Sequence, residues 1–115
     1  MQPQLKRVYD EAEPSDGFRV LVDRLWPRGV TKERAALDLW AKDAAPSAAL
    51  REAFHHGGLS WDEFAAAYRA ELATNPALGD LRAVLTQHPV STLVYGAKDA
   101  EHNHALLLRD ALLAG

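Results

Sequence analysis

The stretch VDRLWPRGV, residues 22–30, places an aspartate, two arginines and a tryptophan directly after a run of apolar residues. A guanidinium group presents a fixed fork of N–H donors that matches phosphate or carboxylate, and an indole ring stacks on planar groups. We therefore predict that this stretch forms one wall of a site for a small anion. Arg24 and Arg28 would hold the anion there, and Trp26 would stack on the ligand.

A second group of polar residues follows the apolar run VSTLVYG and contains a lysine, an aspartate and two histidines: Lys98, Asp99, His102 and His104. The lysine would add positive charge, and His102 could act as an acid or a base near neutral pH, oriented by Asp23 or by Asp99. Asp99 is also a natural N-cap for a helix that begins near residue 100. The free backbone N–H groups of that helix would favour the same anion.

Each of these residues also has a structural explanation. Arg24 could pair with Asp23 or with a helix carboxylate, and Trp26 could pack its loop onto the core. Asp99 could serve as a helix cap alone. His104 precedes Leu108 by four residues, so it could lean against the core as well as contact a ligand.

The elements that would position these groups are short strands separated by helices. Apolar runs predict strands over residues 5–10, 18–23, 37–41 and 90–96. Helices are expected after Ser47, over residues 61–72 behind a Ser60–Glu63 capping box, after Pro76, and over residues 100–115. The pattern predicts one compact α/β domain over residues 1–115, with a small, mostly parallel sheet of three to four strands covered by helices.

Ligands of such sheets bind outside the carboxyl ends of the strands, which is where both polar groups lie. If the strands at 18–23 and 90–96 are neighbours, the two groups face each other. The leading hypothesis is an enzyme, or an enzyme-like binder, for a small phosphate- or nucleotide-bearing molecule, with His102 and Asp23 as its acid–base pair. The alternatives are a nucleic-acid-associated module that uses the same loop, and a protein-interaction domain such as a homodimer built on the helix at 61–72.

Composition narrows these classes. The chain has 115 residues, 48% of them hydrophobic, and a net charge of -3, which argues against binding nucleic acid or membranes by bulk electrostatics. It contains no cysteine, so disulfides, thiolate catalysis and cysteine-ligated metals are excluded. No apolar run approaches the roughly 18 residues of a membrane span, and no secretory signal is visible, so a cytoplasmic protein is expected.

The histidines do not form a familiar metal motif. His102 and His104 are two residues apart, which in a helix would separate them by roughly 200° around the axis. His55 and His56 end a predicted helix, where imidazolium suits the helix dipole without any ligand. We therefore predict no metal site and no cofactor.

The blocks RVLVDRLWPRG and YGAKDAEHNHA resemble the short subgroup of the domain of unknown function 488 family. The resemblance covers residues 7–113. It implies a compact α/β domain of bacteria and archaea, usually cytosolic, in a family without an established reaction.

Longer members of that family carry an Asp-x-Arg element after the early strand and an element with Cys and His after the late one. By resemblance, Asp23 or Arg24 matches the first element, and the two histidines of YGAKDAEHNHA match the second. Where those relatives carry cysteines, this chain has Tyr95 and Asn103. Thiol or Cys-metal chemistry therefore does not transfer to this chain. What the resemblance still implies is that the site lies where the same two strand ends come together.

Overall fold

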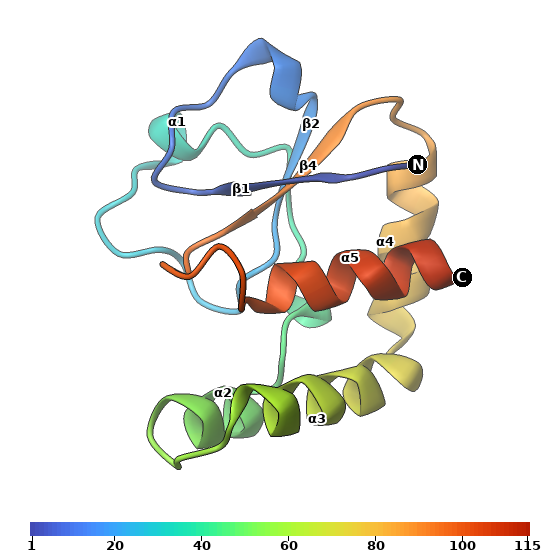
Figure 1. Ribbon diagram of the computed structural model, residues 1–115. Helices are drawn as coiled ribbons and strands as arrows, with labels where there is room; N and C mark the ends of the chain where they lie inside the picture. The colour runs from blue at the N-terminus through green and yellow to red at the C-terminus, as the bar shows by residue number, and fades with distance from the viewer.

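A computed structural model describes all 115 residues and contains a four-stranded sheet in which every strand pair is parallel (Figure 1). The strands are β1 (Gln4–Arg7), β2 (Phe18–Leu21), β3 (Leu39–Trp40) and β4 (Ser91–Tyr95), in the spatial order β1-β4-β2-β3. The predicted α/β class and strand number are thus confirmed. β2 and β4 are hydrogen-bonded neighbours, so the condition on which the predicted site depended holds.

Five α-helices connect and cover the strands: α1 (Lys32–Ala35), α2 (Ala48–His55), α3 (Trp61–Ala73), α4 (Pro76–Thr86) and α5 (His104–Ala114). Two 3-10 turns, η1 (Pro14–Asp16) and η2 (Lys42–Ala44), add to them. The predicted N-caps are in place, since the Ser47 side chain accepts from the Leu50 amide and Ser60 forms its capping box with Glu63. None of the helices combines the length and hydrophobicity that crossing a membrane requires.

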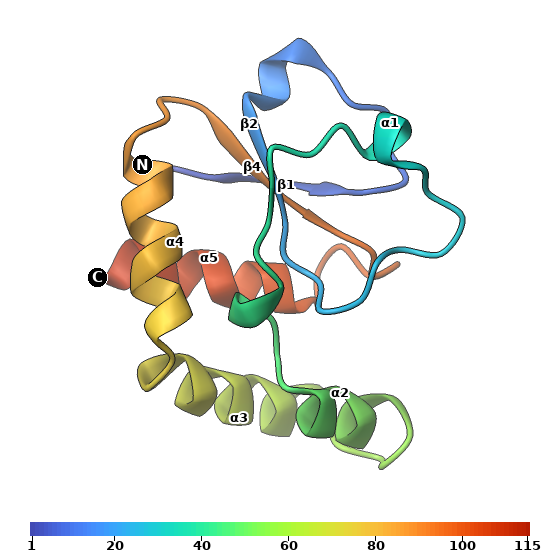
Figure 2. The same ribbon diagram turned by 180° about the vertical axis from the view of Figure 1, so that it is seen from behind.

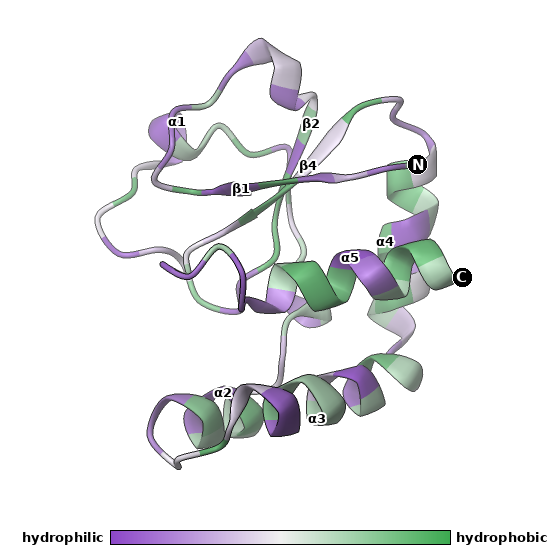
Figure 3. Ribbon diagram, viewed as in Figure 1, coloured by the Kyte–Doolittle hydropathy of each residue, from purple (hydrophilic) through white to green (hydrophobic).

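One face of the sheet carries the main core. Val20, Val22, Leu93 and Tyr95 point towards the helices and pack with buried residues of α3, α4 and α5. Figure 1 shows α5 lying between the sheet and the α2–α3 pair. This placement explains why most of α5 is hydrophobic in Figure 3. The helix-covered face therefore supplies most of the burial that stabilises the fold.

The opposite face is covered by the long connection from β2 through α1 to β3, which Figure 2 shows from behind. A smaller buried cluster, made of Val8, Val30, Ala35 and Val94, lies beneath it. The strand predicted over residues 37–41 shrinks here to the two residues of β3, because only Leu39 and Trp40 pair with β2.

An ion network, which we call the Asp16 network, lies beside the first residues of β2 and consists of Lys6, Glu13, Asp16 and Arg19. Asp16 and Arg19 are buried, and Glu13 is exposed. Arg19 Nη1 donates to Asp16 Oδ2 at 2.6 Å, and its Nε and Nη2 donate to the Ala35 carbonyl at 3.0 and 2.8 Å. Lys6 donates to both Glu13 and Asp16. Burial works to raise the pKa of Asp16, but hydrogen bonds from the Glu13 amide, Lys6 and Arg19 outweigh it and hold the pKa below its ordinary value.

The last helix begins later than the sequence predicted. It starts at His104, and its N-cap is Asn103, whose side chain accepts from the Leu106 amide at 3.1 Å. The predicted cap, Asp99, instead accepts two backbone N–H bonds, at 2.8 and 3.1 Å, that close a turn before the helix. The side-chain oxygens of aspartate and asparagine both accept hydrogen bonds from nearby backbone N–H groups, so either Asp99 or Asn103 could have capped the helix. The helix starts one residue before Ala105, the first of its buried apolar residues.

Candidate functional site

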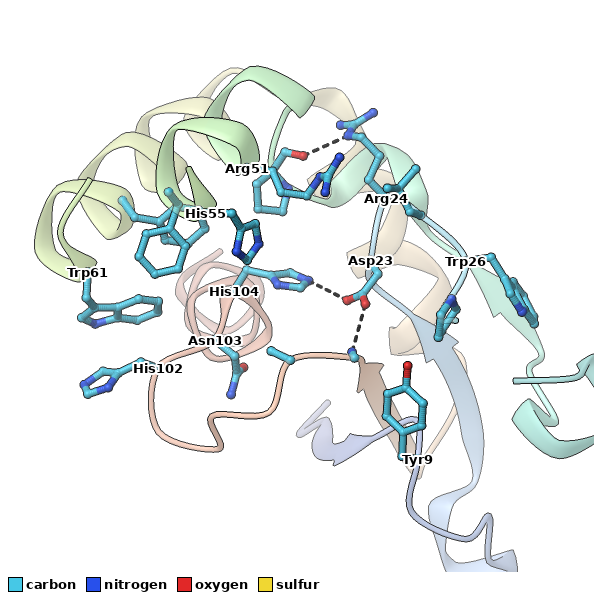
Figure 4. Close-up of a pocket in the computed structure, with 17 residues that line it drawn as sticks. Tyr9, Asp23, Arg24, Trp26, Arg51, His55, Trp61, His102, Asn103 and His104 are labelled. Atoms are coloured by element: carbon cyan, nitrogen blue, oxygen red, sulfur yellow. Dashed lines mark hydrogen bonds and ion pairs between the residues drawn. The ribbon is translucent and has the colours of Figure 1, made fainter. Parts of the chain in front are cut away.

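A cleft of about 340 Å³ opens at the carboxyl ends of β2 and β4 (Figure 4). It lies between the loop after β2, the end of α2, the start of α3 and the loop before α5. Five of the predicted site residues line it: Asp23, Arg24, Trp26, His102 and His104. Three do not: Arg28, Lys98 and Asp99 are exposed outside its lining. The volume is within the range of small-molecule sites.

Asp23 joins the ends of the two central strands at the floor of the cleft. Its Oδ2 accepts the Gly96 amide at 2.9 Å. A Cβ added at Gly96 would lie 2.8 Å from that same oxygen, so the close approach requires glycine. The other carboxylate oxygen, Oδ1, lies 3.1 Å from Nε2 of His104.

The contacts of His104 decide its tautomer. Nε2 lies 3.0 Å from the Val22 carbonyl as well as 3.1 Å from Asp23 Oδ1, and two oxygens this close require a proton on that nitrogen. The N–H is directed at the Val22 carbonyl, so it gives Asp23 Oδ1 electrostatic attraction but no hydrogen bond, and Oδ1 is left buried without one. Nδ1 of the same ring hydrogen-bonds to no group of the protein.

His104, rather than His102, therefore lies beside Asp23. His102 sits at the rim, where its Nδ1 lies 3.3 Å from Asp99 Oδ2 and both side chains are more than half exposed. Backbone N–H bonds from Glu101 and His102, together with the His102 ring, lower the pKa of Asp99. The expected separation of the two histidines around one helix does not apply, because His102 precedes α5.

Arg24 and Trp26 line the cleft and also hold the surrounding loop. Arg24 donates from Nε to the Pro46 carbonyl at 2.9 Å and from Nη2 to the Ala45 carbonyl at 3.2 Å. These bonds tie the end of β2 to the start of α2. Trp26 donates from its indole to the Val30 carbonyl at 2.7 Å and packs against the smaller core cluster. The structural explanation offered for Trp26 is thus confirmed. Arg24 does not pair with Asp23 or with a helix carboxylate, because its hydrogen bonds go to two backbone carbonyls instead.

Arg51, on α2, is a cleft residue that the sequence analysis missed. Its guanidinium makes no hydrogen bond within the protein, and its Nε is buried without a partner. Arg51 Nε and Asp23 Oδ1 are the only buried side-chain polar atoms in the protein that lack a hydrogen bond. Both line the same cleft, as Figure 4 shows. Such atoms are rare in folded proteins and call for an explanation.

The position of Arg51 follows from how α2 is held. Glu71 of α3 accepts from the backbone amide and the hydroxyl of Ser47, at 2.9 and 2.5 Å, and fixes the first turn of α2. Arg51, Phe54 and His55 then share one helix face at spacings of three and four. That spacing is a signal in the sequence, but the sequence does not say which face of α2 meets the strand ends.

Aromatic rings form the wall of the cleft next to α3. Phe54 stacks on Phe64 with ring centroids 4.5 Å apart, and Trp61 lies 5.7 Å from Phe64. Trp61 also lies 5.2 Å from the ring of His102 at the rim. The cleft therefore combines two guanidinium groups, one carboxylate–imidazole pair and an aromatic wall.

A family model described as the inactive DUF488-N3 subclade matches residues 2–115. The chain belongs to this DUF488-N3 family. The family resemblance seen in the sequence is thereby confirmed.

Two relatives of similar length match nearly the whole chain. The chain is 49% identical over 112 residues to the "Uncharacterized protein YeaO" of Escherichia coli (strain K12). The aligned region covers 97% of each of the two chains. It is 43% identical over 109 residues to the "Uncharacterized protein Rv3073c" of Mycobacterium tuberculosis (strain H37Rv), covering 95% of this chain and 92% of the relative. No solved structure matches the chain.

The histidines of this DUF488-N3 domain are spread between the cleft and the surface. His55, His102 and His104 line the cleft, whereas His56 and His88 lie outside its lining. No three His, Asp or Glu side chains come together in a group that could hold a metal ion. The ionisable groups that line the cleft are guanidinium, imidazole, carboxylate and the phenol of Tyr9.

Proposed function

We propose that this DUF488-N3 domain binds a small anionic molecule, such as a phosphate- or nucleotide-bearing one, in the cleft at the carboxyl ends of β2 and β4. The observation that carries the proposal is the Arg51 guanidinium, which lines the cleft with a buried Nε and no acceptor. A buried donor without an acceptor costs free energy, and a bound anion would supply the acceptor.

Arg24 would act as the second cation of this site. Its Nε and Nη2 donate to backbone carbonyls, and Nη1 makes no hydrogen bond within the protein. Guanidinium groups bind phosphate and carboxylate more strongly when two of them converge. The aromatic wall of Phe54 and Trp61 would accept a planar or apolar part of the ligand.

Binding is favoured over catalysis by two observations. The matched subclade is described as inactive. In addition, His104 is held by the Val22 carbonyl and Asp23, and His102 is paired with Asp99 at the exposed rim, so the predicted His102–Asp23 acid–base pair is not assembled. We therefore propose an enzyme-like fold that serves as a binding domain.

The alternatives receive less support. Among the N-terminal arginines, Arg19 is buried in the Asp16 network, and Arg7 and Arg34 donate to backbone carbonyls, so these residues do not make a free basic groove for nucleic acid. The apolar side chains of α3 at Phe64 and Tyr68 are buried in the core of one chain. They are therefore not available as the face of a homodimer.

The proposal is tested by thermal unfolding of the wild type, Arg51→Met and Arg28→Ala with phosphate, sulfate or nucleoside monophosphates. A ligand at about 100 times its Kd should stabilise the fold by about 2.7 kcal/mol, a rise in Tm of several degrees for this size. We expect the rise in the wild type and in Arg28→Ala, whose arginine lies outside the cleft, but not in Arg51→Met. Equal shifts in all three proteins, or no shift with any anion, would refute the site.

A further inference from the structure

We propose that the ligand of this cleft carries a hydrogen-bond donor, a hydroxyl or an amine, close to its anionic group, and that Asp23 recognises this donor. The inference rests on the proposed function and narrows the class of ligand. Its basis is the pair of unsatisfied atoms in one cleft, of which one is a donor and the other an acceptor: Arg51 Nε and Asp23 Oδ1.

The acceptor at Asp23 is held in place by the fold. The Gly96 amide engages Oδ2 at 2.9 Å, and turning Oδ1 towards another donor would break this bond. The nearest nitrogen, Nε2 of His104, directs its N–H to the Val22 carbonyl instead. A carboxylate oxygen that is buried without a hydrogen bond is stabilised strongly by one from a ligand, because bonds to charged acceptors are the stronger class.

His104 does not supply the missing hydrogen bond. Its Nε2 directs its proton to the Val22 carbonyl, and its Nδ1 hydrogen-bonds to no group of the protein. The cleft floor thus presents the carboxylate Oδ1 as an acceptor without a donor. A ligand with only anionic and apolar parts would leave this acceptor unsatisfied.

Charge leads to the same class of ligand. An anion bound at Arg51 shares one cleft of about 340 Å³ with the negative charge of Asp23. Arg24 and Arg51 would compensate the charge of the anion, but no group hydrogen-bonds to Asp23 Oδ1. The two negative groups therefore still repel each other unless a proton donor lies between them. A hydroxyl or ammonium group on the ligand supplies it. Hydroxyalkyl and aminoalkyl phosphates are the simplest probes of this chemistry.

The test is calorimetric titration of three probes that differ in one group: ethyl phosphate, 2-hydroxyethyl phosphate and 2-aminoethyl phosphate, each with its three-carbon counterpart. Inorganic phosphate is titrated beside them. The proteins are the wild type, Asp23→Asn and Asp110→Asn, of which the last removes an exposed carboxylate on α5 outside the cleft. Asp23→Asn keeps an oxygen for the Gly96 amide, so its fold is expected to persist.

We expect the wild type and Asp110→Asn to bind the hydroxyl and amine probes at least about tenfold more tightly than the alkyl probe at one of the two spacings. In Asp23→Asn that preference should fall below about threefold, while the alkyl probe binds as well as or better than before, because a negative charge is gone. Equal binding of all three wild-type probes would overturn the inference, as would a preference that survives Asp23→Asn. If no probe binds and inorganic phosphate does not bind either, the proposed function itself fails.

Discussion

Asp16 precedes β2 and Asp23 follows it, and the fold treats these two carboxylates in opposite ways. Both oxygens of Asp16 are hydrogen-bonded, by Lys6, by the Glu13 amide and by Arg19. Only one oxygen of Asp23 is hydrogen-bonded, by the Gly96 amide. The nearby arginines differ in the same way. The guanidinium of Arg19 hydrogen-bonds to Asp16 and to the Ala35 carbonyl, whereas the guanidinium of Arg51 makes no hydrogen bond within the protein.

This difference separates a structural ion network from the proposed binding site. Buried charges are tolerated when their partners satisfy them, and a protein loses several kcal/mol when one partner is removed. Buried polar atoms without partners destabilise the unliganded fold and are retained where a ligand can complete them. The Asp16 network therefore satisfies the charges where β2 begins, whereas the cleft where β2 stops keeps two unsatisfied polar atoms that the proposed ligand would complete.

The largest effect is expected from Asp16→Asn. The change leaves Arg19, which is buried, without its charge partner, whereas Lys6 keeps its bond to Glu13. We expect a loss of about 3–5 kcal/mol in the free energy of unfolding, measured by urea denaturation at pH 7. That is a large part of the stability of an ordinary domain.

Acid denaturation provides the control for that change. Because the pKa of Asp16 is held below its ordinary value of 3.8, its contribution is present above that pH and is lost as the pH falls below it. The wild type should lose this contribution on acidification, and Asp16→Asn should lack that part of the pH dependence. A loss of less than about 1 kcal/mol at pH 7, or unchanged acid sensitivity in the variant, would show that the network is not structural.

A smaller loss of stability is expected from changing Asn103, which lies at the cleft and is the N-cap of α5. It is buried, caps α5 through the Leu106 amide, and donates to the Asp99 carbonyl at 2.9 Å. Asn103→Ala should lower the free energy of unfolding by about 1–2 kcal/mol, and Asp99→Ala, in an exposed turn, should lower it by less than Asn103→Ala does. Urea denaturation of both variants measures the difference. A larger cost at Asp99 would restore Asp99 as the residue that positions the helix.

Much of the fold was predictable because its signals are local. The apolar runs, the Ser60–Glu63 capping box and the alternation of strands with helices predicted a parallel α/β sheet, and strand adjacency then brought Asp23 and His104 together. The first residue of α5 was not predictable in this way. Asp99 and Asn103 are both good caps, and only burial of Ala105 against the core selects the second.

The contents of the cleft were harder to predict because they depend on tertiary packing. Arg51 belongs to a helix whose facing side is set by the bonds between Ser47 and Glu71 and between Arg24 and the Pro46 carbonyl. Arg28 has the residue type expected for an anion site but lies outside the cleft, since its loop turns away to cover the smaller core cluster. Residue type near a strand end thus predicted the place of the cleft better than the residues that line it.

The smallest effect on stability, and the sharpest test of the contrast, is expected from Arg51→Met in an anion-poor buffer. Methionine keeps the apolar stem of the side chain and removes an unpartnered guanidinium, so the free energy of unfolding should stay within about 0.5 kcal/mol of the wild type or rise by up to about 1 kcal/mol. Urea denaturation of the unliganded proteins measures this. A loss above about 1 kcal/mol would place Arg51 with Arg19 as a structural residue, and the comparison of the two ends of β2 would then fail. No loss, together with loss of the anion-induced rise in Tm, would mean that Arg51 is retained for its ligand.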